Sequence, residues 1–252
     1  VIAAFVSYAS LVLLASILPA TSFGYFSYAL SVMLFAGTAA TLGANRSIIR
    51  FLGQYRSLGR EDLQKGAIRT ALRAACIGGG ATAIGLIVVG ILALVLGDAG
   101  TPLGADPWVI AISLTFVAAF SLGETYSAIL RSYGYVISAL APREIIWRGS
   151  LAIFALAASR MVSTDEQVYL LFIALAGLFL WGTAFYQARV WAKEAASRFG
   201  QGESAFDVIG WRRVTFPLWG ISIIGMATRS LDVLVLGFLA DPPVLGAYFI
   251  AS

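Results

Sequence analysis

Two oppositely charged residues stand inside an apolar run near the end of the chain. Arg229 and Asp232 lie within residues 214–239, a stretch long enough to cross a membrane as a helix. Each charge at the centre of such a helix costs about 2.5–3.5 kcal/mol, so charged residues there are by default functional. Spaced i,i+3, the two share one helix face and can partly neutralise each other. Because a guanidinium bonds two oxygens at once, Arg229 predicts binding of a phosphate-containing anion, with Asp232 orienting it. The alternative is a structural ion pair between packed helices.

A single carboxylate, Glu124, lies near the far end of another apolar run, residues 107–130. An acidic residue there could bind a proton or a cation whose movement drives transport. It could equally pair with Arg131 or Arg148 at the membrane interface. The pattern leaves both interpretations open.

Three polar residues follow the second apolar run: Asn45, Arg46 and Arg50. They could receive an anionic head group at the inner mouth of that helix. They could also serve as ordinary positive-inside anchors in contact with anionic lipid head groups. Neither interpretation is favoured over the other.

The composition indicates a polytopic membrane protein. Hydrophobic residues make up 60% of the 252 residues and charged residues only 12%, against about 25% charged in soluble domains. The net charge of +4 does not indicate a nucleic-acid partner, because the basic residues cluster between apolar runs. The chain has no His, so an HExxH site is impossible, and it contains neither a GxxxxGK[ST] loop nor a GxSxG elbow. We therefore expect no enzyme activity, no metal and no cofactor.

Apolar runs of helical length predict an all-α transmembrane bundle. We expect a tight turn at residues 19–24 and an outer turn at residues 241–243. Three glycines at 78–80 predict a close helix contact or a bend, since the backbone must stay bonded in a bilayer. The expected spans cover residues 1–18, 25–44, 74–96, 107–130, 144–161, 168–188, 214–239 and 244–252.

The side of each loop follows from the basic residues. Residues 42–73 hold seven of the 17 Lys and Arg residues, which predicts a cytoplasmic loop. Alternation from that loop places fifteen of the 17 on the inner side, with Arg160 outside and Arg229 within a span. The N-terminus is therefore predicted to be cytoplasmic, and the protein is expected to be a multi-pass protein of the inner (plasma) membrane.

Three stretches resemble the O-antigen and polysaccharide flippases of the multidrug/oligosaccharidyl-lipid/polysaccharide exporter superfamily. The first is residues 42–55, with Arg-Phe and a basic amphipathic segment. The second is residues 130–135, which lead through Pro142-Arg143 into the fifth span. The third is residues 230–248, with Asp232, a short outer turn and Gly-x-Tyr opening the eighth span.

This resemblance implies two lobes that alternate access to a central cavity. Residues 1–190 would be the six-helix N-terminal lobe, residues 191–213 a cytoplasmic linker, and residues 214–252 the start of the second lobe. The chain begins with Val and stops in an apolar run, so we expect a fragment of a 12–14-helix transporter.

The activity implied is flipping of a lipid-linked oligosaccharide, of the undecaprenyl-pyrophosphate type, from the inner to the outer leaflet. Membrane lipids and other polysaccharide-assembly proteins are the expected partners, and nucleic acid is not. One alternative is a multidrug or cation antiporter of the same fold. Another is a membrane glycosyltransferase or polymerase, which would need its carboxylates among Asp98, Asp106, Asp165, Glu166 and Asp241.

Overall fold

The computed structural model of the chain describes residues 2–95, 107–158, 168–199 and 203–251. In these residues the chain forms helices and turns, and no strand. Continuous helices bond their own backbone groups, as a water-free bilayer core demands. The expectation of a helical membrane bundle is confirmed at this level, because five described segments are long and apolar enough to span a membrane: Ala20–Ser57, Glu61–Val89, Ala111–Ser132, Val168–Arg198 and Val208–Gly237.

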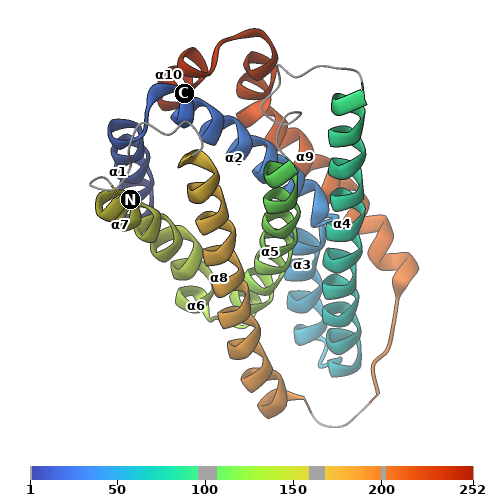
Figure 1. The fold of residues 1–252 in the computed structure, drawn as a ribbon. Helices are drawn as coiled ribbons and strands as arrows, with labels where there is room; N and C mark the ends of the chain where they lie inside the picture. The colour runs from blue at the N-terminus through green and yellow to red at the C-terminus, as the bar shows by residue number, and fades with distance from the viewer. Residues whose placement is uncertain (1, 96–106, 159–167, 200–202, 252) are drawn as a thin grey trace.

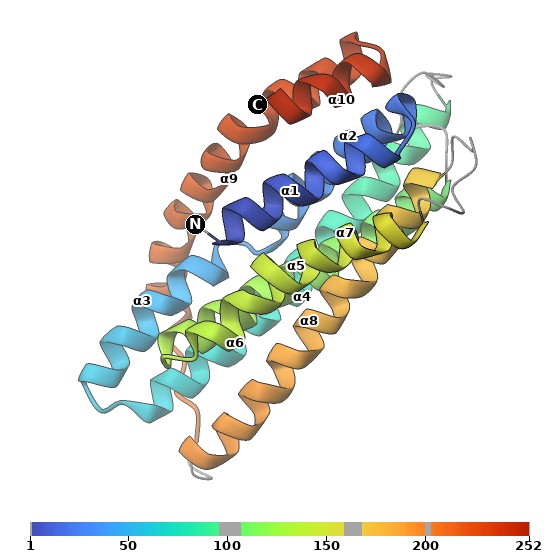
Figure 2. The same ribbon diagram turned by 90° about the vertical axis from the view of Figure 1, so that its left-hand side faces the viewer.

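The helices run roughly side by side in one bundle (Figure 1). Figure 2 shows α9 and α10 along one side of this bundle and α8 along the opposite side, with α2 and α5 between them. In chain order the helical elements are α1 (Ile2–Ile17), α2 (Ala20–Ala40), α3 (Ala44–Ser57), α4 (Glu61–Val95), α5 (Pro107–Ser132), α6 (Val136–Ala141), the π-helical turn η1 (Pro142–Ile146), α7 (Trp147–Ala158), α8 (Val168–Arg198), α9 (Val208–Leu239) and α10 (Pro242–Ala251).

Two hydrophobic clusters fill the bundle, one beyond the other along its length. The first joins α1, α2, α5, α7 and α8 around buried side chains that include Phe26, Met33, Phe116 and Phe172. The second joins α3, α4, α5, α8 and α9 around Ile48, Leu52, Ile129, Trp191 and Trp211. The second cluster contains α3 and the first turns of α9, so these segments belong to the packed structure.

A sharp break separates α2 from α3. Leu42 and Gly43 adopt left-handed φ angles of 46° and 74°, which end the regular helix. The break leaves two carbonyls of α2 without their usual i+4 partners, although the Ala39 carbonyl still accepts from the Leu42 backbone N–H at 3.1 Å. The Trp219 indole N–H on α9 donates to the Ala39 carbonyl at 2.9 Å. The Ser121 hydroxyl on α5 lies 3.2 Å from both the Ala40 carbonyl and the Ala75 carbonyl of α4, so it can donate to either. Two neighbouring helices are thereby bonded to the end of α2.

Two glycines allow close contacts with α2. A Cβ on Gly78 of α4 would lie 2.0 Å from the Ala40 carbonyl oxygen. A Cβ on Gly24 of α2 would lie 1.8 Å from the Pro242 carbonyl oxygen of α10. Both distances are far below van der Waals contact, so only glycine fits. The expected close helix contact in the 78–80 run is confirmed at Gly78.

The basic segment 42–73 is helical, which corrects its prediction as a loop. Helix α3 buries one face, at Ala44, Ile48, Phe51, Leu52 and Tyr55, while its charged residues point away from the core. The turn between α3 and α4 covers only residues 58–60, and α4 begins at Glu61, not at residue 74. The sequence shows residues 42–55 as a basic amphipathic segment, but the charge of the whole stretch 42–73 predicted a loop.

Other predicted boundaries also shift. Helix α2 begins at Ala20, so residues 19–24 are not a turn; Pro19 precedes the helix, where its missing N–H is harmless. Helix α8 continues to Arg198 and α9 begins at Val208, so helices occupy most of the expected linker 191–213. The expected span 144–161 divides into η1 and α7, and residues 159–161 lie outside the described part. At the expected turn 241–243, α10 already begins at Pro242.

The contact at Gly78 gives a first testable prediction. Replacing Gly78 by Ala forces α4 away from the end of α2, so the free energy of unfolding should fall by about 1–3 kcal/mol. Gly80→Ala is the matched control, because a Cβ at Gly80 meets nothing within 4 Å. Thermal unfolding of the purified protein in detergent measures both. Equal midpoints for the two variants would show that α4 does not pack on α2 in this way.

Candidate functional site

Five polar residues from α3, α5, η1 and α7 form a charged cluster, which we call the Glu124 cluster. The Glu124 carboxylate on α5 forms an ion pair with Arg143 on η1, and the Asn45 amide on α3 donates to it at 3.5 Å. Arg143 also pairs with Glu144, whose carboxylate lies 3.9 Å from the Arg148 guanidinium. Only 12% of the Glu124 side chain is exposed, so Arg143 supplies the counter-charge that a buried carboxylate requires.

Hydrogen bonds to one carbonyl hold α6, the short helix that leads into η1, against α5 and α8. After α5 the chain reverses at Gly134, where φ is 88°, and runs back as α6. The Ala139 carbonyl of α6 accepts from the Ser127 hydroxyl of α5 at 3.0 Å and from the Gln187 amide of α8 at 2.8 Å. The π-helical turn that follows presents Arg143 to Glu124. Such turns change the direction of side chains relative to a regular helix.

The partner of Glu124 differs from both predicted partners. The sequence suggested Arg131 or Arg148 for an ion pair, whereas the described structure pairs Glu124 with Arg143. Arg148 instead approaches Glu144. The pairing depends on the reversal at Gly134 and on the π-helical turn η1, which bring Arg143 back against α5, and neither has a signal in the sequence.

The three polar residues 45, 46 and 50 do not lie on one face of α3. Asn45 faces α5 and belongs to the Glu124 cluster. Arg46 and Arg50 are exposed on α3, and neither forms an ion pair with another described residue. The sequence grouped them by proximity, but successive helical positions point in different directions.

Arg229 and Asp232 lie on α9 without forming an ion pair with each other. Asp232 accepts a hydrogen bond of 2.7 Å from the Tyr248 hydroxyl of α10 and one of 2.8 Å from its neighbour's backbone N–H. Arg229 is exposed, and it forms no ion pair with any residue in the described ranges. Arg229 lies about 15 Å from the end of α9 at Leu239, or half the thickness of a bilayer core. No ion pair within the described ranges neutralises its charge.

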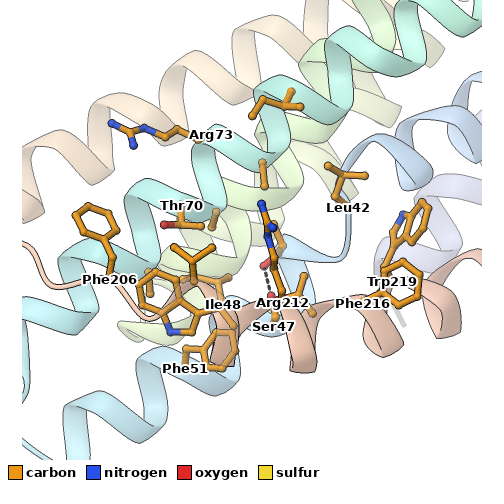
Figure 3. A pocket seen from close by; sticks show the side chains of 18 residues that line it. Leu42, Ser47, Ile48, Phe51, Thr70, Arg73, Phe206, Arg212, Phe216 and Trp219 are labelled. Carbon is orange, nitrogen blue, oxygen red and sulfur yellow. Dashed lines mark hydrogen bonds between the residues drawn. The ribbon is translucent and has the colours of Figure 1, made fainter.

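A groove of about 680 Å³ lies between α3, α4 and α9 (Figure 3). We call it the α3–α4–α9 groove. Figure 3 draws Arg212 in the middle of the lining side chains and Arg73 at the edge, pointing away. The 18 lining residues are Leu42, Ala44, Ser47, Ile48, Phe51, Ala67, Thr70, Ala71, Arg73, Ala74, Ile77, Phe206, Val208, Trp211, Arg212, Thr215, Phe216 and Trp219.

Sequence reasoning missed this groove. Its lining residues recur at helical spacing on each helix, for example at Arg212, Thr215, Phe216 and Trp219 of α9. The same spacing appears in α4 at residues 67, 70, 71, 74 and 77. Each face alone is typical of ordinary packing. The pattern could have predicted the three faces, but not that they meet around a space.

Comparisons with known proteins do not assign a family. No protein-family model matches the chain, and no curated protein or solved structure matches it either. The functional proposal therefore rests on the residues and their geometry.

The Glu124–Arg143 ion pair gives a second prediction. Arg143→Gln leaves a mostly buried carboxylate without its counter-charge, so unfolding should become easier by about 3–5 kcal/mol. Glu124→Gln combined with Arg143→Gln should recover much of that loss, because no unpaired charge remains. Thermal unfolding of the unmodified protein, the two single variants and the double variant gives a double-mutant cycle, which measures the interaction energy between Glu124 and Arg143.

Arg148→Gln is the control for loss of a nearby arginine, because its contact with Glu144 is longer and more exposed. It should change the midpoint little. If the double variant is as unstable as the sum of the two single variants, Glu124 and Arg143 do not interact.

Proposed function

We propose that the chain is part of a membrane transporter that flips a lipid-linked oligosaccharide, of the undecaprenyl-pyrophosphate type, from the cytoplasmic to the outer leaflet by alternating access. The flipped glycan would serve cell-surface polysaccharide biosynthesis. The expected residues are Arg229 for the pyrophosphate, with Asp232 and Asn45, Arg46 and Arg50 as secondary candidates.

The observation that carries this proposal is the unpaired Arg229. An arginine near the midplane is costly to insert, and within the described residues nothing compensates its charge. The tyrosine hydrogen bond to Asp232 supports the same conclusion, since it occupies the carboxylate that the i,i+3 spacing suggested as a partner. A phosphate-bearing substrate would supply two anionic oxygens to the free guanidinium.

The environment of Glu124 argues against an antiporter that uses this carboxylate. Coupling by proton or cation needs a carboxylate that can exchange its partner during the cycle. Glu124 is instead held by Arg143 and Asn45, which favours a structural role. For the enzyme alternative, four of the five candidate carboxylates, Asp98, Asp106, Asp165 and Glu166, lie outside the described residues.

The proposal includes the expected organisation. Residues 1–190 form the N-terminal lobe of a 12–14-helix transporter, residues 191–213 connect the lobes on the cytoplasmic side, and residues 214–252 begin the second lobe. The N-terminus is cytoplasmic, in the inner membrane, and other polysaccharide-assembly proteins are candidate partners. The close packing of α9 and α10 on α2 supports this proposal, because such a transporter needs contacts between its lobes.

Replacing Arg229 tests the function directly. Surface glycan is measured in cells whose only copy of the intact protein carries Arg229→Ala or Arg229→Lys, with expression and membrane insertion followed in parallel. Loss of charged hydrogen bonds to a phosphate should lower export about tenfold or more for Arg229→Ala. Arg229→Lys keeps the charge and should lose less.

Arg213→Ala is the matched control, since Arg213 is an exposed arginine on the same helix α9. It should export normally. Normal export by both Arg229 variants would contradict the role given to Arg229. Surface glycan that does not depend on the protein at all would overturn the flippase proposal itself.

A further inference from the structure

We propose that the α3–α4–α9 groove binds an anionic phospholipid, with the head-group phosphate at Arg212 and an acyl chain along the apolar wall, while Arg73 at the edge of the groove adds positive charge. Such a lipid would lie between the first helices of the chain and α9 and hold them together. The site is distinct from the flipped substrate's site at Arg229. We place this lipid in the cytoplasmic leaflet, and only this placement rests on the orientation in the proposed function.

The two arginines lie at the level where lipid head groups are expected. Hydropathy predicts that two spans begin at residues 74 and 214, and Arg73 and Arg212 come just before them. The fold brings these two boundaries to one groove, because Ala74 and Thr215 both line it. Ala44, the end of a third predicted span, lines it as well. Three helices therefore enter the apolar region at the same level around this groove.

The charge of the groove is complementary to a phosphate. None of its 18 lining residues is acidic, and within the described ranges neither Arg73 nor Arg212 forms an ion pair. Thr70 of α4 and Ser47 of α3 also line the groove and carry hydroxyl groups, of which the Ser47 hydroxyl donates to the Ala44 carbonyl at 3.4 Å. Basic pockets between membrane helices are typical sites for anionic lipid head groups.

The remainder of the groove suits a hydrocarbon chain. On the membrane side of the arginines it is lined by Leu42, Ile77, Phe216 and Trp219. Ile77 and Phe216 are 67% and 70% exposed, so the groove opens there to the surface that faces lipid. An acyl chain in the groove would cover these side chains. It would fill the space between α4 and α9 and add van der Waals contacts to both helices.

A lipid-linked glycan fits this groove poorly. On the far side of the arginines the wall consists of the aromatic side chains of Phe51, Phe206 and Trp211. Phe51 and Trp211 are buried and belong to the second hydrophobic cluster. That wall offers no polar surface to a sugar, whereas a compact glycerophosphate needs only the arginines.

Native mass spectrometry of the intact protein in detergent tests the proposal. The protein is titrated separately with phosphatidylglycerol and phosphatidylcholine, and bound lipid is counted, with inorganic phosphate added as a competitor. We expect selective retention of phosphatidylglycerol. Arg212→Gln should weaken it about fivefold, and Arg73→Gln together with Arg212→Gln should weaken it further.

Two additional variants distinguish lipid binding in the groove from nonspecific attraction of the lipid to surface charge. Arg213→Gln removes the neighbouring charge, which does not line the groove, and should leave retention unchanged. Thr70→Trp keeps every charge and fills the groove at a half-buried position, so it should abolish retention while the protein remains monodisperse.

Three results would overturn the proposal: equal retention of both lipids, equal losses for Arg212→Gln and Arg213→Gln, or full retention by Thr70→Trp. Displacement of the lipid by millimolar inorganic phosphate would also overturn it and assign the arginines to a soluble anion. Because no glycan is present in this assay, its outcome is independent of whether the protein exports glycan.

Discussion

The structure depends on how the end of α2 satisfies its carbonyl groups. A helix that stops within or near a membrane exposes carbonyls that no water can bond, and each one left alone would cost several kcal/mol. Here the Ala39 carbonyl accepts from Trp219 of α9, and the Ser121 hydroxyl of α5 reaches the Ala40 carbonyl. The same region packs against Gly78 of α4. Three helices that are distant in sequence are therefore joined at one break in the backbone.

That junction places both candidate sites. Immediately beyond the break, α3 sends Asn45 toward Glu124 on one side and lines the α3–α4–α9 groove with Ala44 and Ser47 on the other. A straight continuation of α2 would have pointed these residues elsewhere. The left-handed turn at Leu42 and Gly43 thus connects the charged cluster with the basic groove. Any movement of α9 relative to α3 would act on the turn through Trp219.

The sequence predicted the parts of the fold that depend on local hydrophobicity. The long apolar segments and the break near residue 44 follow from bilayer thickness, which acts on each segment separately. The helical state of α3 was also readable, from Ile48, Phe51, Leu52 and Tyr55 on one face, but the seven basic residues of segment 42–73, three of them in α3, favoured a loop instead. In contrast, the Glu124–Arg143 pair and the groove arise where segments far apart in sequence meet. Their geometry depends on a π-helical turn and on three helix orientations, for which a single sequence contains no local signal.

The contact between Gly24 and the Pro242 carbonyl has a consequence for biosynthesis. Pro242 follows Gly24 by 218 residues. At about 5–20 residues per second, roughly 10–40 s separate the synthesis of the two surfaces. During this interval α2 must remain in the bilayer with the face that α10 later covers turned to lipid. It can remain there because its backbone is already bonded within the helix, and Phe23, Tyr28 and Val32 make that face largely apolar. Helix α2 is thus among the first helices to be inserted and among the last to gain all of its contacts with other helices.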